Sequence, residues 1–260
     1  MSLLTNRVAL VTGAGRGIGR AIALALAAEG AKVAVTARSV GELEEVVGAV
    51  RAAGGTALAV VADLSQAADA ARVVDEAKSK LGVVDILVNN AGLGSSANPR
   101  PVVEFDDEFW AQSLAINLTA PYLLSKAVLP DMLAQGWGRI IMVASINGKI
   151  GSLHGAAYAA SKHGVLGLMR TMAMEVAGRG VTVNAICPGP VHTVMNDRRI
   201  EYDAKRRGIS LADLESGITP IGRRLEPDEI APWAVLLAAE NAAAVTGQAF
   251  NIDGGVLMTG

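Results

Sequence analysis

Cysteine is almost absent from this sequence, since Cys187 is the only one among 260 residues. A single thiol cannot form an intrachain disulfide, and no group of Cys and His residues has the spacing of a metal site. We therefore expect no metal ion, and the reduced thiol agrees with a cytoplasmic setting.

Long hydrophobic runs are also missing. The most apolar stretches, such as "AIALALAA" and "APWAVLLAA", are far shorter than the roughly 20 residues needed to cross a bilayer. The first residues, "MSLLTNRVALVTG", have no basic segment followed by a long apolar run and a small-residue cleavage site. The sequence thus predicts neither a membrane protein nor an exported one.

A strong charge of either sign is the third absence. The formal net charge is -2, 18% of the residues are charged and 51% are hydrophobic. This composition argues against disorder and against electrostatic binding of nucleic acid. A chain of 260 residues can form one large α/β domain or two small ones, with a sizeable core in either case.

Short β-branched runs alternate with longer stretches of helical periodicity. The runs read "RVALVT", "KVAVTA", "ALAVVA", "VDILVNN", "GRIIMVAS", "GVTVNAIC" and "QAFNID". Helices are expected over residues 17–30, 40–53, 66–81, 105–135, 156–177 and 227–239. The runs are apolar nearly throughout, as in strands covered on both faces. The pattern predicts an α/β fold: a doubly wound, seven-stranded parallel sheet with helices on both faces.

No linker divides the chain, so we expect a single domain over residues 1–260. One polar segment, at about 191–220, interrupts the regular alternation and follows the end of a strand. Ligands of α/β sheets bind beyond the carboxyl ends of strands, which makes this segment a candidate substrate lid. The alternative is an ordinary solvated insertion.

A glycine-rich turn, "TGAGRGIGRAIA", links the first expected strand to the first helix. Its Gly13, Gly17 and Gly19, with Ile18 between the last two, allow a tight turn and close approach of backbone N–H groups to a pyrophosphate. The helix N-terminus favours negative charge. A turn that is glycine-rich by chance is the alternative, but its position after a strand favours a dinucleotide site.

The end of the second strand, "VTARS", indicates which dinucleotide binds. An acidic residue there holds the ribose hydroxyls of NAD, whereas this sequence has Arg38 and Ser39. Arg38, with Ser39 and with Arg16 from the glycine turn, can hold a 2′-phosphate. We therefore expect NADP(H), with a solvated surface charge as the alternative role of Arg38.

Two further turns fall where a dinucleotide would lie. After the third strand, Asp63 and Leu64 of "ADL" place a carboxylate near the adenine, and after the fourth strand "NNAG" brings Asn90, Ala91 and Gly92 near a ribose. Each motif by itself is equally consistent with an ordinary turn.

Tyr158 and Lys162 are four residues apart on an expected helix, so their side chains share one face. A nearby ammonium lowers the pKa of a phenol, which favours proton exchange with a substrate oxygen. Ser145, at the end of the fifth strand, can donate a hydrogen bond to an oxygen on which charge develops.

Together, "TGAGRGIG", "NNAG", Asn117 in "INLTA", Ser145, "YAASK", "PGPVHT" and the terminal "NIDGG" resemble the short-chain dehydrogenase/reductase (SDR) family, over essentially the whole chain. The resemblance implies a Rossmann fold, NADP(H) and a catalytic tetrad of Asn117, Ser145, Tyr158 and Lys162. By the same resemblance, Tyr158 is the acid or base, Ser145 orients the carbonyl, and Lys162 tunes the tyrosine and binds the nicotinamide ribose. The resemblance also implies that Asn117 would hold a water that relays protons.

The resemblance also places "PGPVHT" against the nicotinamide, through Pro188, Gly189, Val191 and Thr193. Several stretches look most like 3-oxoacyl-carrier-protein reductases and polyketide ketoreductases, so a 3-oxoacyl thioester is the expected substrate. The alternatives are an NAD-dependent 3-hydroxybutyrate or secondary-alcohol dehydrogenase and a non-catalytic dinucleotide-binding regulator.

A basic cluster and a subunit interface complete these expectations. The cluster, in "RRIEYDAKRRG", is able to meet an acyl-carrier protein or a CoA phosphate, although interleaved acids make a solvated face the alternative. The resemblance further implies a homotetramer or homodimer.

Overall fold

The computed structural model describes residues 2–258, so the last two residues of "NIDGGVLMTG" lie outside it. Within that range the strands form one parallel sheet of seven strands in the order β3-β2-β1-β4-β5-β6-β7. They are β1 (Val8–Thr12), β2 (Lys32–Ala37), β3 (Ala57–Val61), β4 (Ile86–Asn89), β5 (Gly138–Val143), β6 (Val181–Pro188) and β7 (Ala249–Ile252). The order reverses between β1 and β4, as expected of a doubly wound fold.

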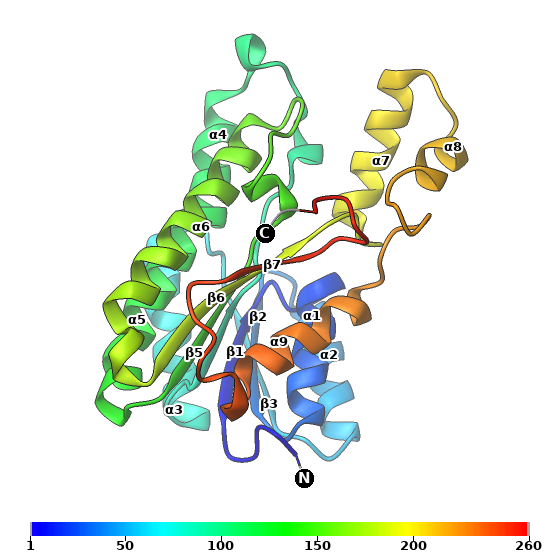
Figure 1. Ribbon diagram of the computed structural model, residues 1–260. Coiled ribbons are helices and arrows are strands. Elements are labelled where there is room, and N and C mark those ends of the chain that lie inside the picture. The colour runs from blue at the N-terminus through cyan, green and yellow to red at the C-terminus, as the bar shows by residue number, and fades with distance from the viewer. Residues whose placement is uncertain (1, 259–260) are drawn as a thin grey trace.

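Helices cover both faces of the sheet (Figure 1). One layer holds α1 (Gly17–Ala28), α2 (Val40–Ala52) and α9 (Pro227–Ala238), and the other holds α3 (Ala67–Leu81), α5 (Ala120–Gln135) and α6 (Ala156–Val176). No helix of residues 2–258 is long and apolar enough to cross a membrane.

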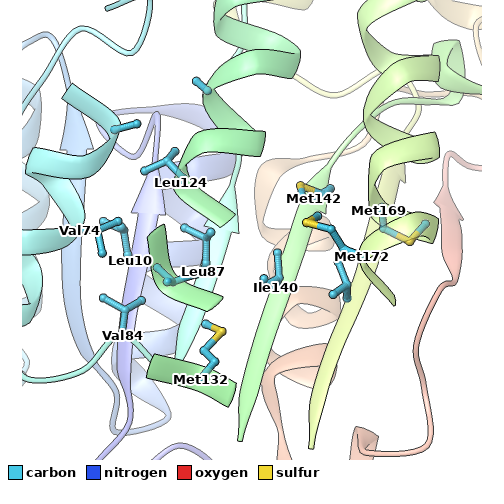
Figure 2. Close-up of a cluster of buried hydrophobic side chains, with 14 of the residues drawn as sticks. Leu10, Val74, Val84, Leu87, Leu124, Met132, Ile140, Met142, Met169 and Met172 are labelled. Carbon is cyan, nitrogen blue, oxygen red and sulfur yellow. The ribbon is translucent and has the colours of Figure 1, made fainter. Parts of the chain in front are cut away.

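Alternate residues of each central strand face different layers. In β1, Leu10 packs against α3 and α5, whereas Ala9 and Val11 face the helices of the other layer. Figure 2 shows the first of these two cores, where Leu87 and Ile140 lie among leucine, valine and methionine side chains. Both faces of a strand are therefore buried, which is why the strands lack polar alternation.

The helix expected over residues 105–135 is divided. Asp106 caps α4 (Asp107–Leu114) by accepting the N–H groups of Glu108 and Phe109, so the helix begins later than expected. A π-helical turn, Ala115–Thr119, then separates α4 from α5. Pro121 has no N–H to donate to the carbonyl of Asn117 four residues earlier, and the wider turn occurs at this place.

The polar segment after β6 forms two helices, α7 (Val194–Arg207) and α8 (Leu211–Ser216). The side chains of Thr193 and Ser210 cap them by accepting the N–H groups of Asn196 and Asp213. Figure 1 shows both helices standing beyond the carboxyl ends of the strands.

Candidate active site

A single cavity of about 1180 Å³ runs along the carboxyl edge of the sheet. All the positions expected to bind a cofactor line it: Gly13, Arg16, Gly17, Ile18, Gly19, Arg38, Ser39, Asp63, Leu64, Asn90, Ala91, Gly92, Tyr158, Lys162, Pro188, Gly189, Val191 and Thr193. Ser145 lines it as well, and Asn117 does not.

The glycine turn is fixed to the end of β4. The amide nitrogen of Asn90 donates to the carbonyl oxygens of Thr12 (2.9 Å) and Gly13 (3.1 Å). The buried hydroxyl of Thr12 accepts the N–H groups of Asn90 and Ala91, both at 3.0 Å, and donates to Val88. The side-chain amide that we expected near a ribose is therefore used to hold the turn, because two carbonyl oxygens of that turn face it.

Two glycines of the turn have no room for a side chain. A Cβ at Gly19 would lie 2.3 Å from the Gly13 oxygen, and one at Gly13, where φ is +61°, would lie 2.8 Å from the Ala91 Cα. Glycine is thus required for the turn to lie against the end of β4. This cradle, at the N-terminus of α1 and in the wall of the cavity, fits a dinucleotide pyrophosphate.

Arg38 and Ser39 follow β2 at the far end of the cavity. Arg38 is exposed and forms no ion pair with any described residue, whereas Arg16 pairs with Glu42 at 3.2 Å. Asp63 accepts the N–H of Ser65, so one of its oxygens serves the turn, as the alternative expectation proposed. Sequence reasoning missed Glu42, which lines the cavity from the first turn of α2.

Ser145, Tyr158 and Lys162 gather at the other end. Ser145 follows β5, and its oxygen accepts the N–H of Asn147 at 3.1 Å, which leaves its own hydrogen free to donate. Tyr158 and Lys162 lie on one face of α6, with the Lys162 Nζ 5.7 Å from the centroid of the tyrosine ring. Lys162 is only 5% exposed, and its Nζ donates to the carbonyl oxygen of Val143 at 2.9 Å.

Burial decides the protonation of this pair. Burial raises the pKa of Tyr158, and a hydrogen bond with the Ser145 side chain lowers that pKa by a smaller amount. Burial also lowers the pKa of Lys162, to about 8. The expectation that the ammonium lowers the pKa of the phenol is thus wrong for this arrangement. Lys162 donates to Val143 instead of to the phenol, and desolvation dominates both groups.

Asn117 lies in the π-helical turn, and its side chain is fully buried. Its Oδ1 accepts the N–H of Leu93 at 2.7 Å, and its Nδ2 donates to the oxygens of Leu93 and Ser161. Asn117 therefore connects the loop after β4 to α6, the helix that carries Tyr158 and Lys162. A Cβ at Gly92 would lie 3.5 Å from the Asn117 Oδ1 and 3.8 Å from the Lys162 Nζ, so the three residues are neighbours.

The segment after β6 forms another part of the cavity wall. Val191 forms an isolated bridge with Leu225, and Arg199 of α7 donates to Ser95 and to the carbonyl oxygen of Leu153. Arg224 pairs with Asp197 of α7 and with Glu215 of α8, and thereby ties the two helices together. These contacts hold α7 against the loops that carry Ser95 and Leu153, both of which line the cavity.

Comparison with known proteins gives consistent results. The family described as short chain dehydrogenase matches residues 7–203. A granaticin polyketide synthase putative ketoacyl reductase 1 from Streptomyces violaceoruber is 43% identical, covering 96% of this chain and 92% of its own. A 3-oxoacyl-[acyl-carrier-protein] reductase from Synechocystis sp. is 41% identical, covering 99% and 100%. A variant of the actinorhodin polyketide ketoreductase, solved with NADPH, has a TM-score of 0.91 at 39% identity and covers 96% and 97%.

Because the pKa of Lys162 is lowered in the folded protein, the free energy of unfolding should depend on pH. Between pH 8 and about 10.4 the unfolded chain keeps a proton on this lysine that the folded chain has lost, so folding becomes more favourable as pH rises. The unfolding free energy of the unaltered protein, minus that of Lys162→Met, should increase by about 2 kcal/mol over this range. Urea denaturation at a series of pH values measures it, and parallel profiles would contradict the burial of a charged lysine.

Proposed function

The chain belongs to the short-chain dehydrogenase/reductase family, and on this basis we propose that it is an NADPH-dependent oxidoreductase that interconverts a ketone and a secondary alcohol. One observation carries the proposal: a continuous cavity joins the glycine cradle and Arg38 to Ser145, Tyr158 and Lys162. The cradle has the shape for a pyrophosphate, and the opposite end has the donors that carbonyl reduction needs. The related ketoreductase solved with NADPH supports the same cofactor.

The bound cofactor would supply a hydride, and the chain supplies position and protons. Ser145, whose oxygen is already held by the N–H of Asn147, directs its hydrogen at the substrate carbonyl oxygen. Tyr158 keeps its proton at neutral pH because burial raises its pKa, and it gives that proton to the oxygen as negative charge develops there.

Lys162 remains mostly protonated at pH 7, and its Nζ is held by the Val143 carbonyl beside the tyrosine. There it stabilises the phenolate left when Tyr158 has donated its proton, and it is placed to hold a cofactor ribose. Asn117 completes the expected tetrad. Its hydrogen bonds with the loop after β4 and with Ser161 support a role in holding α6, and with it Lys162, at a fixed position relative to that loop. This role would be in addition to the proton relay that the family resemblance implies.

The substrate that we propose is a 3-oxoacyl thioester or a related ketone. The cavity that Tyr158 lines is also lined by the apolar residues Leu153, Val194 and Met195, which suit an acyl chain. A carrier protein or CoA would approach over α7. Two of the basic residues there, Arg199 and Arg206, already pair with Asp203, which leaves Arg198, Lys205 and Arg207 as candidates for a phosphate or an acidic carrier.

We further propose that residues 1–260 act as one domain with the segment at about 191–220 as substrate lid. The contacts of Arg199 with both loops of the cavity wall support this. A homotetramer or homodimer in the cytoplasm is proposed from the family resemblance. The exposed side chain of Met174 on α6 supports such an interface, and a solution mass of one chain would contradict it.

Replacing Tyr158 tests the proposed chemistry. Tyr158→Phe should reduce ketone-dependent oxidation of NADPH by about 10²-fold or more, because the acid is lost, while the affinity for NADPH changes little. Tyr122→Phe, at an exposed position of α5, serves as the matched control and should retain activity. The assay is absorbance at 340 nm with a panel of 3-oxoacyl thioesters. Unchanged turnover in Tyr158→Phe would contradict the proposal.

Replacing Arg38 tests the choice of cofactor. Arg38→Asp should weaken NADPH binding by about tenfold or more, since it replaces a phosphate partner with a carboxylate, and should improve NADH binding. Lys80→Asp, with the same change of charge on an exposed residue of α3, should alter neither. Titration of cofactor fluorescence gives both affinities, and equal affinity of the unaltered protein for NADPH and NADH would refute this role.

A further inference from the structure

Glu42 brings a carboxylate to the end of the cavity where Arg38, Ser39 and Arg16 lie. We propose that Glu42 is a specificity-determining residue. Its carboxylate competes with the 2′-phosphate of NADP(H) for Arg16 and so limits the preference for NADP(H) over NAD(H). The inference rests on the proposed function, because it concerns the same cofactor site.

The position of Glu42 is fixed by its surroundings. It is the third residue of α2, and its N–H donates to the Ser39 oxygen that caps the helix. Its side chain lies over Gly15, where an added Cβ would be 2.7 Å from the Glu42 Oε2 and 2.8 Å from the Glu42 Cβ. The absence of a side chain at Gly15 thus creates the space that the carboxylate occupies, directly beside the glycine turn.

Arg16 is the partner of this carboxylate. Its Nη1 lies 3.2 Å from the Glu42 Oε1, across 26 residues of sequence, with side chains 67% and 34% exposed respectively. Arg38, by contrast, has no ion-pair partner among residues 2–258. A 2′-phosphate would therefore meet one free guanidinium, one guanidinium already neutralised, and one carboxylate of its own sign.

The effect is selective for the phosphorylated cofactor. NAD(H) has a neutral hydroxyl at the 2′ position, so a charge at Glu42 changes its binding little, whereas NADP(H) must displace Glu42 from Arg16 and approach its charge. A carboxylate in the first turn of a helix also stabilises the helix through its interaction with the helix dipole. That stabilisation would not require an ion pair with a residue of the glycine turn. The ion pair with Arg16 is what ties Glu42 to the cofactor.

The test measures equilibrium dissociation constants of NADPH and NADH by fluorescence titration. Glu42→Gln keeps the size and removes the charge, and it should bind NADPH about two- to fivefold more tightly, the range expected of an exposed ion pair, with NADH affinity unchanged. Glu44→Gln is the matched control, since it removes the same charge from an exposed position of α2 outside the cavity, and it should leave both affinities unchanged.

A double-mutant cycle shows whether Arg16 carries the effect. In a protein that already carries Arg16→Gln, Glu42→Gln should increase the affinity for NADPH by less than half as much as it does in the unaltered protein. The reason is that Glu42 and the phosphate no longer compete for Arg16. The gain should also shrink in 0.5 M salt, since both groups are partly exposed. Circular dichroism verifies that each variant is folded.

Each outcome is decisive. If Glu42→Gln binds NADPH with unchanged or weaker affinity, Glu42 does not compete with the phosphate for Arg16, and the proposal is wrong. An equal gain in the Arg16→Gln background would also overturn the competition. Failure of the unaltered protein to bind either cofactor would refute the proposed function itself, which distinguishes the two failures.

Discussion

The attachment of the glycine turn to the end of β4 is the constraint on which the rest of the site depends. Thr12 and Asn90 make it through five hydrogen bonds, two from the amide of Asn90 and three at the Thr12 hydroxyl. It fixes the cradle relative to Gly92, which lies beside the side chains of Asn117 and Lys162. A cofactor held by the cradle would thereby be placed relative to α6, the helix that carries Tyr158 and Lys162, although the two segments are far apart in the sequence.

Electrostatics at the chemical end are governed by desolvation. Lys162 is nearly fully buried with one backbone acceptor, and this lowers its pKa to about 8 while the pKa of Tyr158 rises. Burial of the charged lysine lowers the free energy of unfolding. The same arrangement suits proton transfer, because it holds a protonated phenol beside a cation that can stabilise the phenolate. At the opposite end the cavity is open, and ion pairs there are weakened by solvent.

The sequence predicted the sheet and the positions around the cavity because both follow from local patterns. Seven apolar runs became seven strands among the described residues, and glycines after the first strand marked the turn. Side-chain partners could not be predicted in this way, since they depend on tertiary contacts. Lys162 faces Val143, Asn90 serves the glycine turn, and Glu42 meets Arg16 across 26 residues. The π-helical turn at Asn117 also lacked a clear periodic signal.

The central claim is that one cavity brings a nicotinamide cofactor and a ketone together beside Tyr158. The most direct test uses NADPH carrying deuterium at both positions of nicotinamide C4, with a 3-oxoacyl thioester as substrate and mass spectrometry of the product. Direct hydride transfer predicts one deuterium on the carbon of the new alcohol. An alcohol without deuterium, or no alcohol from a protein that binds both NADPH and the thioester, would contradict the account.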